Sequence, residues 1–158
     1  MNILVSACLL GENCKYNGGD NKNKVLIELL EGHNIISVCP EVLGGLSAPR
    51  PPAEIIDGRA ISKDGNDVTE AFIKGAREVV DAAIEYECDA AVMKAKSPSY
   101  GKGVIYDGTF SGKLVNGNGI ATRALMDAGI HVFTEDDANG AFRRFLTMAP
   151  VYNLPAYK

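Results

Sequence analysis

Two cysteines carry the most reactive side chains of this sequence, and both stand where a short apolar run gives way to glycines. Cys8 ends the run that begins at Ile3, and Cys39 ends the run that begins at Asn34. A cysteine at the end of a strand can present its sulfur to a cleft, where nearby amides and lysines favour the thiolate. Two neighbouring thiolates can share an iron–sulfur cluster or a zinc ion. The alternative is that both are small buried core residues.

The other two cysteines have different surroundings. Cys14 lies in the loop that follows Cys8, where its thiol can turn toward the same site or remain without a role. Cys88 follows a helical pattern and precedes an apolar run. We therefore expect Cys88 in the core, at the opposite end of the sheet.

Two oxygen-bearing side chains stand close to the same loops. Glu41 lies two residues after Cys39, where a carboxylate can move a proton, or can simply pair with Arg50. Ser97 begins a Ser-Pro-Ser turn, and its hydroxyl can bond a substrate or its own backbone. The lysines on either side of Ala95 either offset a thiolate-rich site or are solvated charges.

Other familiar catalytic patterns are missing from the sequence. Its two histidines, His33 and His131, are both expected at the end of the sheet away from the ligand, which argues against a Ser-His-Asp site. The sequence has no phosphate-binding loop, and the pair Gly117 and Gly119 is too weak a signal for nucleotide binding.

The elements that must position these residues follow from apolar periodicity and turn residues. Asp57-Gly58 predicts a hairpin within 54–62. Apolar runs predict buried strands, and one-sided apolar spacing predicts helices. The expected strands are 3–8, 34–39, 89–94 and 130–134, and the expected helices are 24–31, 67 or 69–87, 120–128 and 138–147. Loops are expected at 11–23, at 40–52 without regular structure, and at 96–119, which can carry a hairpin.

Strands that alternate with helices predict an α/β fold with a mostly parallel sheet and flanking helices, Rossmann-like and three-layered. We expect one domain over residues 1–158, since the chain shows no linker and no repeat. Ligands of such sheets bind in a crevice at the C-terminal ends of the strands. Three glycine-rich loops follow three predicted strands, so these loops should converge on one crevice.

The composition limits the class of protein. The chain has 158 residues, 46% of them hydrophobic, which is enough for a core without disulfides or metals as staples. A net charge of −4 argues against a nucleic-acid partner, and no apolar run is long enough to span a membrane. The N-terminus has no export signal. We therefore expect a cytoplasmic protein, a monomer or a small homo-oligomer, that takes a small-molecule substrate.

Four stretches together resemble a bacterial family, formerly a domain of unknown function, whose characterised members are thiouracil desulfurases. The stretches are Ser6–Gly11 with Tyr16-Asn17-Gly18, Cys39–Leu46 with Pro49-Arg50, Lys94–Ser99, and Tyr106–Gly112. The resemblance extends from Ser6 to about Asp136. It implies a 4Fe–4S cluster held by three cysteines, with one iron open to the thiocarbonyl sulfur of a thiolated pyrimidine. Water then replaces the sulfur without net redox change.

The resemblance also implies roles for individual residues. Cys8 and Cys39 match two cluster ligands, Glu41 matches the acid/base residue, and Ser97 matches the serine that activates the substrate. Soft sulfur suits iron bound by thiolates. We further expect the substrate pocket to include four neighbours of these residues, namely Ser99, Tyr100, Gly44 and Gly45.

The third ligand of the family follows Ser-Pro-Ser, and this chain has Tyr100 at that place, a hard oxygen donor. Three readings follow. In the first, Cys14 supplies the third thiolate. In the second, the site holds another metal such as zinc, a redox thiol pair, or only a labile cluster. In the third, the chain has lost activity and binds a heterocycle that stacks on Tyr100. The first expectation is thus an iron–sulfur-dependent desulfurase, and the alternative is a non-catalytic binding protein or a zinc or redox site.

Overall fold

The computed structural model describes residues 1–152, and the side chains of residues 1–148; the last six residues of the predicted domain, 153–158, lie outside the described residues. In chain order the elements are β1 (Asn2–Ser6), the 3-10 helix η1 (Ala7–Leu10), α1 (Lys24–Leu29), β2 (Asn34–Val38), α2 (Pro40–Leu43), β3 (Ala53–Ile56), β4 (Arg59–Ser62), α3 (Thr69–Glu85), β5 (Ala90–Met93), β6 (Val104–Tyr106), β7 (Leu114–Asn116), α4 (Ile120–Asp127), β8 (His131–Thr134), the 3-10 helix η2 (Glu135–Asp137) and α5 (Ala141–Tyr152). None of the helices in this described part has the length and apolar character that a bilayer crossing requires.

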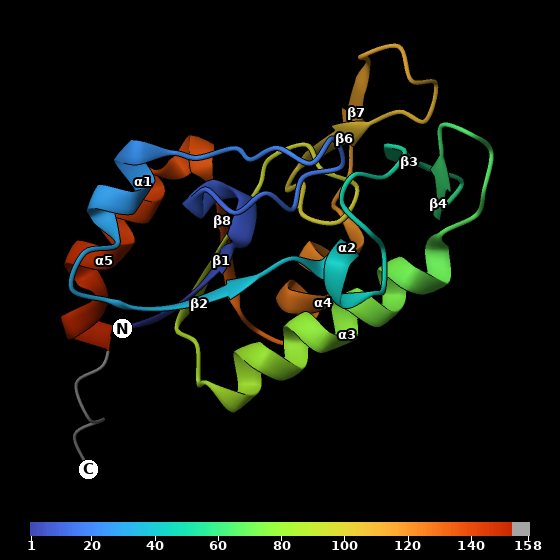
Figure 1. The fold of residues 1–158 in the computed structure, drawn as a ribbon. Coiled ribbons are helices and arrows are strands. Elements are labelled where there is room, and N and C mark those ends of the chain that lie inside the picture. Colours follow the sequence, from blue (N-terminus) through green and yellow to red (C-terminus); the bar gives the residue numbers. More distant parts are fainter. Residues whose placement is uncertain (153–158) are drawn as a thin grey trace.

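The central sheet has the strand order β2-β1-β5-β8, and each neighbouring pair is parallel. Helices cover both of its faces, with α1 and α5 on one side and α3 and α4 on the other (Figure 1). The predicted α/β class, parallel sheet and three-layer arrangement are therefore confirmed.

The alternation of side chains along β1 shows how the sequence specifies these layers. Ile3 and Val5 point to one face and pack with Leu26 of α1 and Phe142 of α5. Leu4 points to the other face, in a cluster that also includes Val79 of α3. All of these side chains are fully buried. Successive side chains of a strand point to opposite faces, so the continuous apolar run of β1 fills both layers.

The strand order reverses at β1, which places the ligand edge of the sheet. The chain passes from β1 through α1 to β2 on one side, and then crosses to β5 on the other side of β1. Ligands bind at such switch points, beyond the carboxyl ends of the strands. The segments that begin at Ala7, Cys39 and Lys94 leave the sheet at this edge, as the sequence predicted.

The segment 40–52 differs from its prediction. It was expected to have no regular structure, but Pro40–Leu43 forms the short helix α2, with Cys39 as its N-cap residue. Proline lacks an N–H and has a helical φ, so it suits the first turn of a helix. The four prolines and two adjacent glycines of this segment predicted irregular structure, and the helix instead uses Pro40 as its first residue.

Two antiparallel hairpins lie outside the main sheet. In the β3–β4 hairpin, Asp57 and Gly58 both have positive φ, of 50° and 77°, as the predicted two-residue turn requires. The β6–β7 hairpin lies within the predicted 96–119 loop. Figure 1 shows both hairpins at the same end of the molecule, where they extend the rim of the ligand edge.

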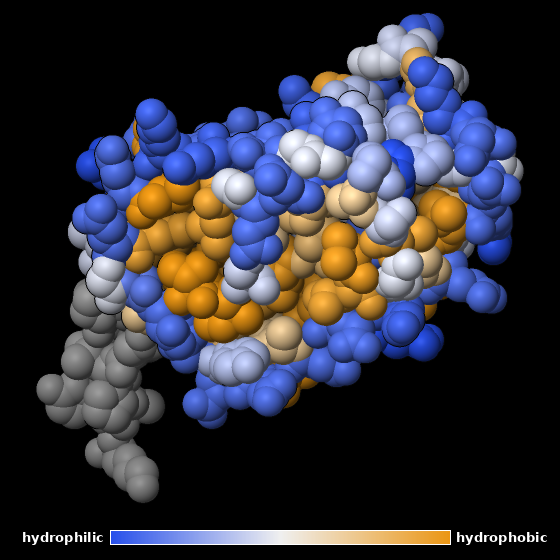
Figure 2. Space-filling model, viewed as in Figure 1, coloured by the Kyte–Doolittle hydropathy of each residue, from blue (hydrophilic) through white to orange (hydrophobic). Residues whose placement is uncertain are grey.

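The strand β2 forms one edge of the sheet, and apolar side chains gather around it. Figure 2 shows this apolar area across the region of α1, β2 and α2. Val42 and Leu43 of α2 are exposed there, at 43% and 38%. The outer side of the segment that carries Cys39 is thus exposed. On its inner side, β2 pairs with β1 and α2 packs against α3.

The contact between α2 and α3 provides a test of that support. Gly75 lies in the middle of α3, and a Cβ there would be 1.8 Å from the backbone oxygen of Pro40. We expect Gly75→Ala to destabilise the fold by about 1–3 kcal/mol through overpacking, although alanine is the better helix former. Urea unfolding measures this change. Lys74→Ala, at the exposed neighbouring position, should stay within about 0.5 kcal/mol of the parent; equal stability of both variants would contradict the close approach.

Candidate active site

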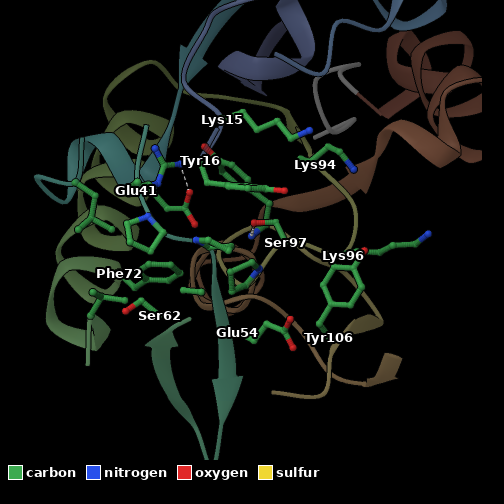
Figure 3. A pocket seen from close by; sticks show the side chains of 18 of the residues that line it. Lys15, Tyr16, Glu41, Glu54, Ser62, Phe72, Lys94, Lys96, Ser97 and Tyr106 are labelled. Carbon is green, nitrogen blue, oxygen red and sulfur yellow. Dashed lines mark hydrogen bonds and ion pairs between the residues drawn. The ribbon is translucent and has the colours of Figure 1, made fainter. Parts of the chain in front are cut away.

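A cleft of about 620 Å³ opens at the carboxyl edge of the sheet. Its walls come from the loops after β1, β2 and β5 and from both hairpins. Figure 3 shows side chains from these segments pointing into one space. Among the residues that line it are Cys8, Cys14, Tyr16, Cys39, Glu41, Arg50, Lys94, Ser97, Tyr100 and Tyr106.

Three cysteines from separate segments meet in this cleft. Cys8 lies in η1, directly after β1, and Cys39 begins α2. Cys14 lies in the loop between them, which folds back onto η1 because the Asn21 N–H donates to the Cys8 carbonyl at 2.9 Å. All three side chains line the cleft, and the Cys39 thiol donates to the Cys14 carbonyl at 3.9 Å. The structure thus brings the uncertain third cysteine to the two strand-end cysteines.

The three thiols influence each other strongly. The hydrogen bond from Cys14 lowers the pKa of Cys39 to about 6, against the opposing effect of burial. The same donor lowers the pKa of Cys8, with smaller contributions from Asn21 and Lys94. The pKa of Cys14 itself is raised, because its proton serves both neighbours. A lowered thiol pKa favours the thiolate, which is the form that binds soft metals.

The remaining cysteine is separate from this group. Cys88 precedes β5, at the opposite end of the sheet from the cleft, and lies in the apolar cluster that includes Leu4. Burial raises its pKa to about 11, so it stays a neutral thiol. Because Cys88 lies outside the cleft, its substitution can serve as a control for substitutions of the other three cysteines.

Glu41 lies in the first turn of α2 and is held at both carboxylate oxygens. Arg50 forms an ion pair with one oxygen, and the side chains of Arg50 and Glu41 are only 7% and 14% exposed. The Ser99 hydroxyl donates to the other oxygen at 3.4 Å. Arg50 also donates to the Cys14 carbonyl at 3.0 Å, which ties the carboxylate to the thiol loop.

Arg50 is the main feature that sequence reasoning undervalued. The sequence offered its pairing with Glu41 only as an alternative to a functional role for the carboxylate. The structure shows the Glu41–Arg50 pair inside the cleft, so pairing with Arg50 does not remove the carboxylate from the site. A signal was available, because Arg50 follows Glu41 by nine residues in the same predicted loop, and a guanidinium is well suited to hold a carboxylate.

Ser97 uses its hydroxyl as a double acceptor. The N–H groups of Ser99 and Tyr100 donate to Ser97 Oγ at 3.1 and 3.2 Å, and the side chain also lines the cleft. The predicted backbone bonding is therefore present. A hydroxyl has two acceptor sites and one proton, so Ser97 keeps its proton for a group in the cleft.

Lys94 is fixed where β5 leaves the sheet. Its backbone N–H donates to Ser6 Oγ at 3.0 Å, and its ammonium pairs with Glu135 at 3.0 Å. Glu135 also accepts the Ala95 N–H at 2.9 Å. This network sets the start of the loop that carries Ser97.

The four predicted pocket neighbours have mainly supporting positions. Ser99 is 1% exposed and reaches Glu41 rather than the open cleft. Gly44 and Gly45 are not among the described residues that line the cleft. A Cβ on Gly44 would be 2.0 Å from the Ala71 oxygen, which explains this glycine by packing against α3.

Tyr100 lies beside the thiols but is 4% exposed. Its hydroxyl donates to the Val38 carbonyl at 3.1 Å. Burial raises the pKa of the phenol well above its ordinary value. The side chain is therefore a buried neutral support between β2 and the cleft.

This position leads to a stability prediction. Tyr100→Phe removes the hydrogen bond to Val38 and should lower the free energy of unfolding by about 1 kcal/mol. Tyr100→Cys also leaves a cavity and should cost about 3–5 kcal/mol, as for other aromatic truncations. Urea denaturation measures both. Tyr86→Phe, on an exposed ring, is the control; a Tyr100→Phe protein as stable as this control would contradict the supporting role.

The donor chemistry of the cleft is that of thiols. Cys8, Cys14 and Cys39 all line it, and thiolates are the ligand type that iron–sulfur clusters take. Within the described residues, no group of three His, Cys, Asp or Glu side chains is arranged so that it could hold a metal ion.

The fold and the cleft define a parallel α/β protein whose ligand site, at the switch point of its sheet, is lined by thiols and a carboxylate. Residues 3–137 match the family model described as 2-thiouracil desulfurase. The chain therefore belongs to the 2-thiouracil desulfurase family, which confirms the resemblance found in its sequence.

Two similar proteins cover almost the whole chain. The uncharacterized protein YbbK of Bacillus subtilis (strain 168) is 40% identical over 147 residues, which are 87% of this chain and 97% of YbbK. The solved structure of the 4Fe-4S-dependent thiouracil desulfidase TudS matches with a TM-score of 0.84 and 36% identity, over 94% of this chain and 98% of TudS. The residues 3–137 matched by the family model include all of the described residues that line the cleft.

Proposed function

We propose that this protein hydrolyses a thiolated pyrimidine such as thiouracil, with a 4Fe–4S cluster held by Cys8, Cys14 and Cys39. The thioamide C=S group and one water become a carbonyl group and hydrogen sulfide, and no electron is gained or lost. The observation that carries the proposal is the meeting of three thiols in the same cleft as Glu41 and Ser97. Membership of the family and the similarity to TudS support it.

The three thiols divide the work of binding such a cluster. The lowered pKa values of Cys8 and Cys39 favour their thiolate forms, and Cys14 would lose its proton on binding. When bound, a cluster with three protein ligands supplies an iron that acts as a soft Lewis acid toward a thiocarbonyl sulfur.

Ser97 and Glu41 supply the proton chemistry around the substrate. Ser97 donates its free proton to a polar atom of the heterocycle, which orients the ring and stabilises charge that develops there. Glu41 takes a proton from the attacking water and returns one to the leaving sulfur. Arg50 and Ser99 fix the two carboxylate oxygens, so that Glu41 keeps one orientation through both transfers.

All four cysteines are free thiols, in accord with a reducing compartment. We place the reaction in the cytoplasm on this basis. Free thiols there also keep a cluster site available for loading, since oxidation to a disulfide would remove two ligands.

Sulfide release after anaerobic reconstitution with iron and sulfide tests the function. With 2-thiouracil, reconstituted protein that is freed of excess sulfide should produce sulfide and uracil in equal amounts, and apo-protein should produce neither. A fully loaded protein that binds 2-thiouracil but releases no sulfide would instead favour the binding-only alternative.

A further inference from the structure

Tyr16 presents the most exposed aromatic ring of the cleft, and we propose that it stacks on the pyrimidine ring of the substrate. The side chain is 42% exposed and lines the cleft, two residues after Cys14. The inference rests on the proposed function, because it assigns a binding role within that reaction. It adds recognition of a planar ring, a role that the thiols, Glu41 and Ser97 do not have.

The backbone holds Tyr16 in place without help from its ring. The Arg50 N–H donates to the Tyr16 carbonyl at 2.6 Å. The segment then turns back, because the Gly18 N–H donates to the Lys15 carbonyl at 2.9 Å and the Lys15 N–H to the Gly19 carbonyl at 3.1 Å. A ring on a fixed backbone, with its surface left open, is prepared for a planar ligand.

The two sides of the ring have different neighbours. The Lys15 ammonium lies 5.7 Å from the ring centroid, on one side of it. Figure 3 shows Ser97 toward the other side, with the ring of Tyr16 reaching across the cleft near Glu41. A heterocycle between Tyr16 and Ser97 would therefore stack on the Tyr16 ring and, in the same position, accept a hydrogen bond from the Ser97 hydroxyl. An aromatic face tolerates any planar base, and the serine adds the polar selection.

The other aromatic residues near the thiols are less suited to this role. Tyr100 is 4% exposed with its hydroxyl bonded to Val38, and Phe72 is 1% exposed. Tyr106, at the end of β6, lies across the cleft from Lys15 and Tyr16 in Figure 3. We therefore assign stacking to Tyr16 and not to Tyr100, for which the sequence offered stacking as one of three readings.

Binding and kinetics of Tyr16 variants test this role. Tyr16→Ala should weaken uracil binding, measured by calorimetry, and raise KM for 2-thiouracil by at least about fivefold, the lower end for loss of one base–aromatic stack. Tyr16→Phe keeps the ring and should stay within about twofold. Iron content and cluster absorbance should match the parent in both variants. Tyr86→Ala, which removes an equally exposed ring outside the cleft, should change nothing.

The outcomes separate this inference from the proposed function. If the parent releases sulfide while Tyr16→Ala binds uracil and 2-thiouracil as tightly as the parent, the stacking role is overturned and the function stands. If Tyr16→Phe is as weak as Tyr16→Ala, the hydroxyl and not the ring is the contact, which also overturns stacking. If the parent neither binds uracil nor releases sulfide, the function fails, and the stacking role fails with it.

Discussion

Cys14→Ser is expected to abolish cluster binding and sulfide release after anaerobic reconstitution, although the protein remains folded. Cys14 lines the cleft together with Cys8 and Cys39, and a serine hydroxyl is a hard, weakly acidic replacement for its thiol. Loss of groups that merely support a metal ligand already costs about 10–100-fold in affinity, so loss of a ligand itself should cost at least about 100-fold. Iron analysis and cluster absorbance measure the effect directly.

Cys88→Ala is the matched control for this change. Cys88 is buried at the other end of the sheet, so its removal should lower stability slightly and leave the iron content unchanged. Circular dichroism of Cys14→Ser should match the parent, because Cys14 is only half-buried in a loop. A Cys14→Ser protein with full iron and normal turnover would show that Cys14 is not the third ligand. Tyr100, which stands at the position of the family's third ligand, would then be the next residue to test.

Glu41→Gln should retain the cluster and lose about 100–10,000-fold in kcat for 2-thiouracil, the usual contribution of a positioned general acid/base. The amide has nearly the shape of the carboxylate and can still accept a hydrogen bond from Arg50. It cannot take a proton from water. Single-turnover kinetics with fully loaded protein measure the step, and unchanged cluster absorbance shows that the ligands are intact.

Glu78→Gln on the exposed surface of α3 controls for a general change of charge, and its kcat should equal that of the parent. Near-normal turnover by Glu41→Gln would exclude the proton role of Glu41. Loss of iron in proportion to loss of rate would instead make Glu41 a structural partner of Arg50, whose other contact is the Cys14 carbonyl.

The sheet and the two strand-end cysteines were predictable because they rest on local patterns. The run from Ile3 and the run from Asn34 are apolar and β-branched, and both become parallel strands. Parallel strands deliver their C-terminal ends to one edge, so Cys8 and Cys39 had to be neighbours. The Asp57-Gly58 turn was equally local, since it depends on two positive φ angles.

The rest of the site depends on contacts between loops, which no periodicity reveals. The placement of Cys14 requires hydrogen bonds such as that from Asn21 to the Cys8 carbonyl. Arg50 joins the thiol loop to α2 from a segment that has neither helix nor strand. Tyr16 owes its position to the Arg50 backbone. Each of these contacts connects segments with no secondary structure in common, so the sequence could name the residues but not their meeting point.

Hydrolysis of 2-thiouracil in water labelled with ¹⁸O tests the central claim most directly. The account predicts that reconstituted protein converts 2-thiouracil to uracil that carries one ¹⁸O atom, with one sulfide released per uracil and no external reductant or oxidant. Mass spectrometry of the uracil and a sulfide assay give both quantities from one reaction. Uracil without the label, a requirement for added electrons, or no sulfide from fully loaded protein would contradict non-redox desulfuration in this cleft.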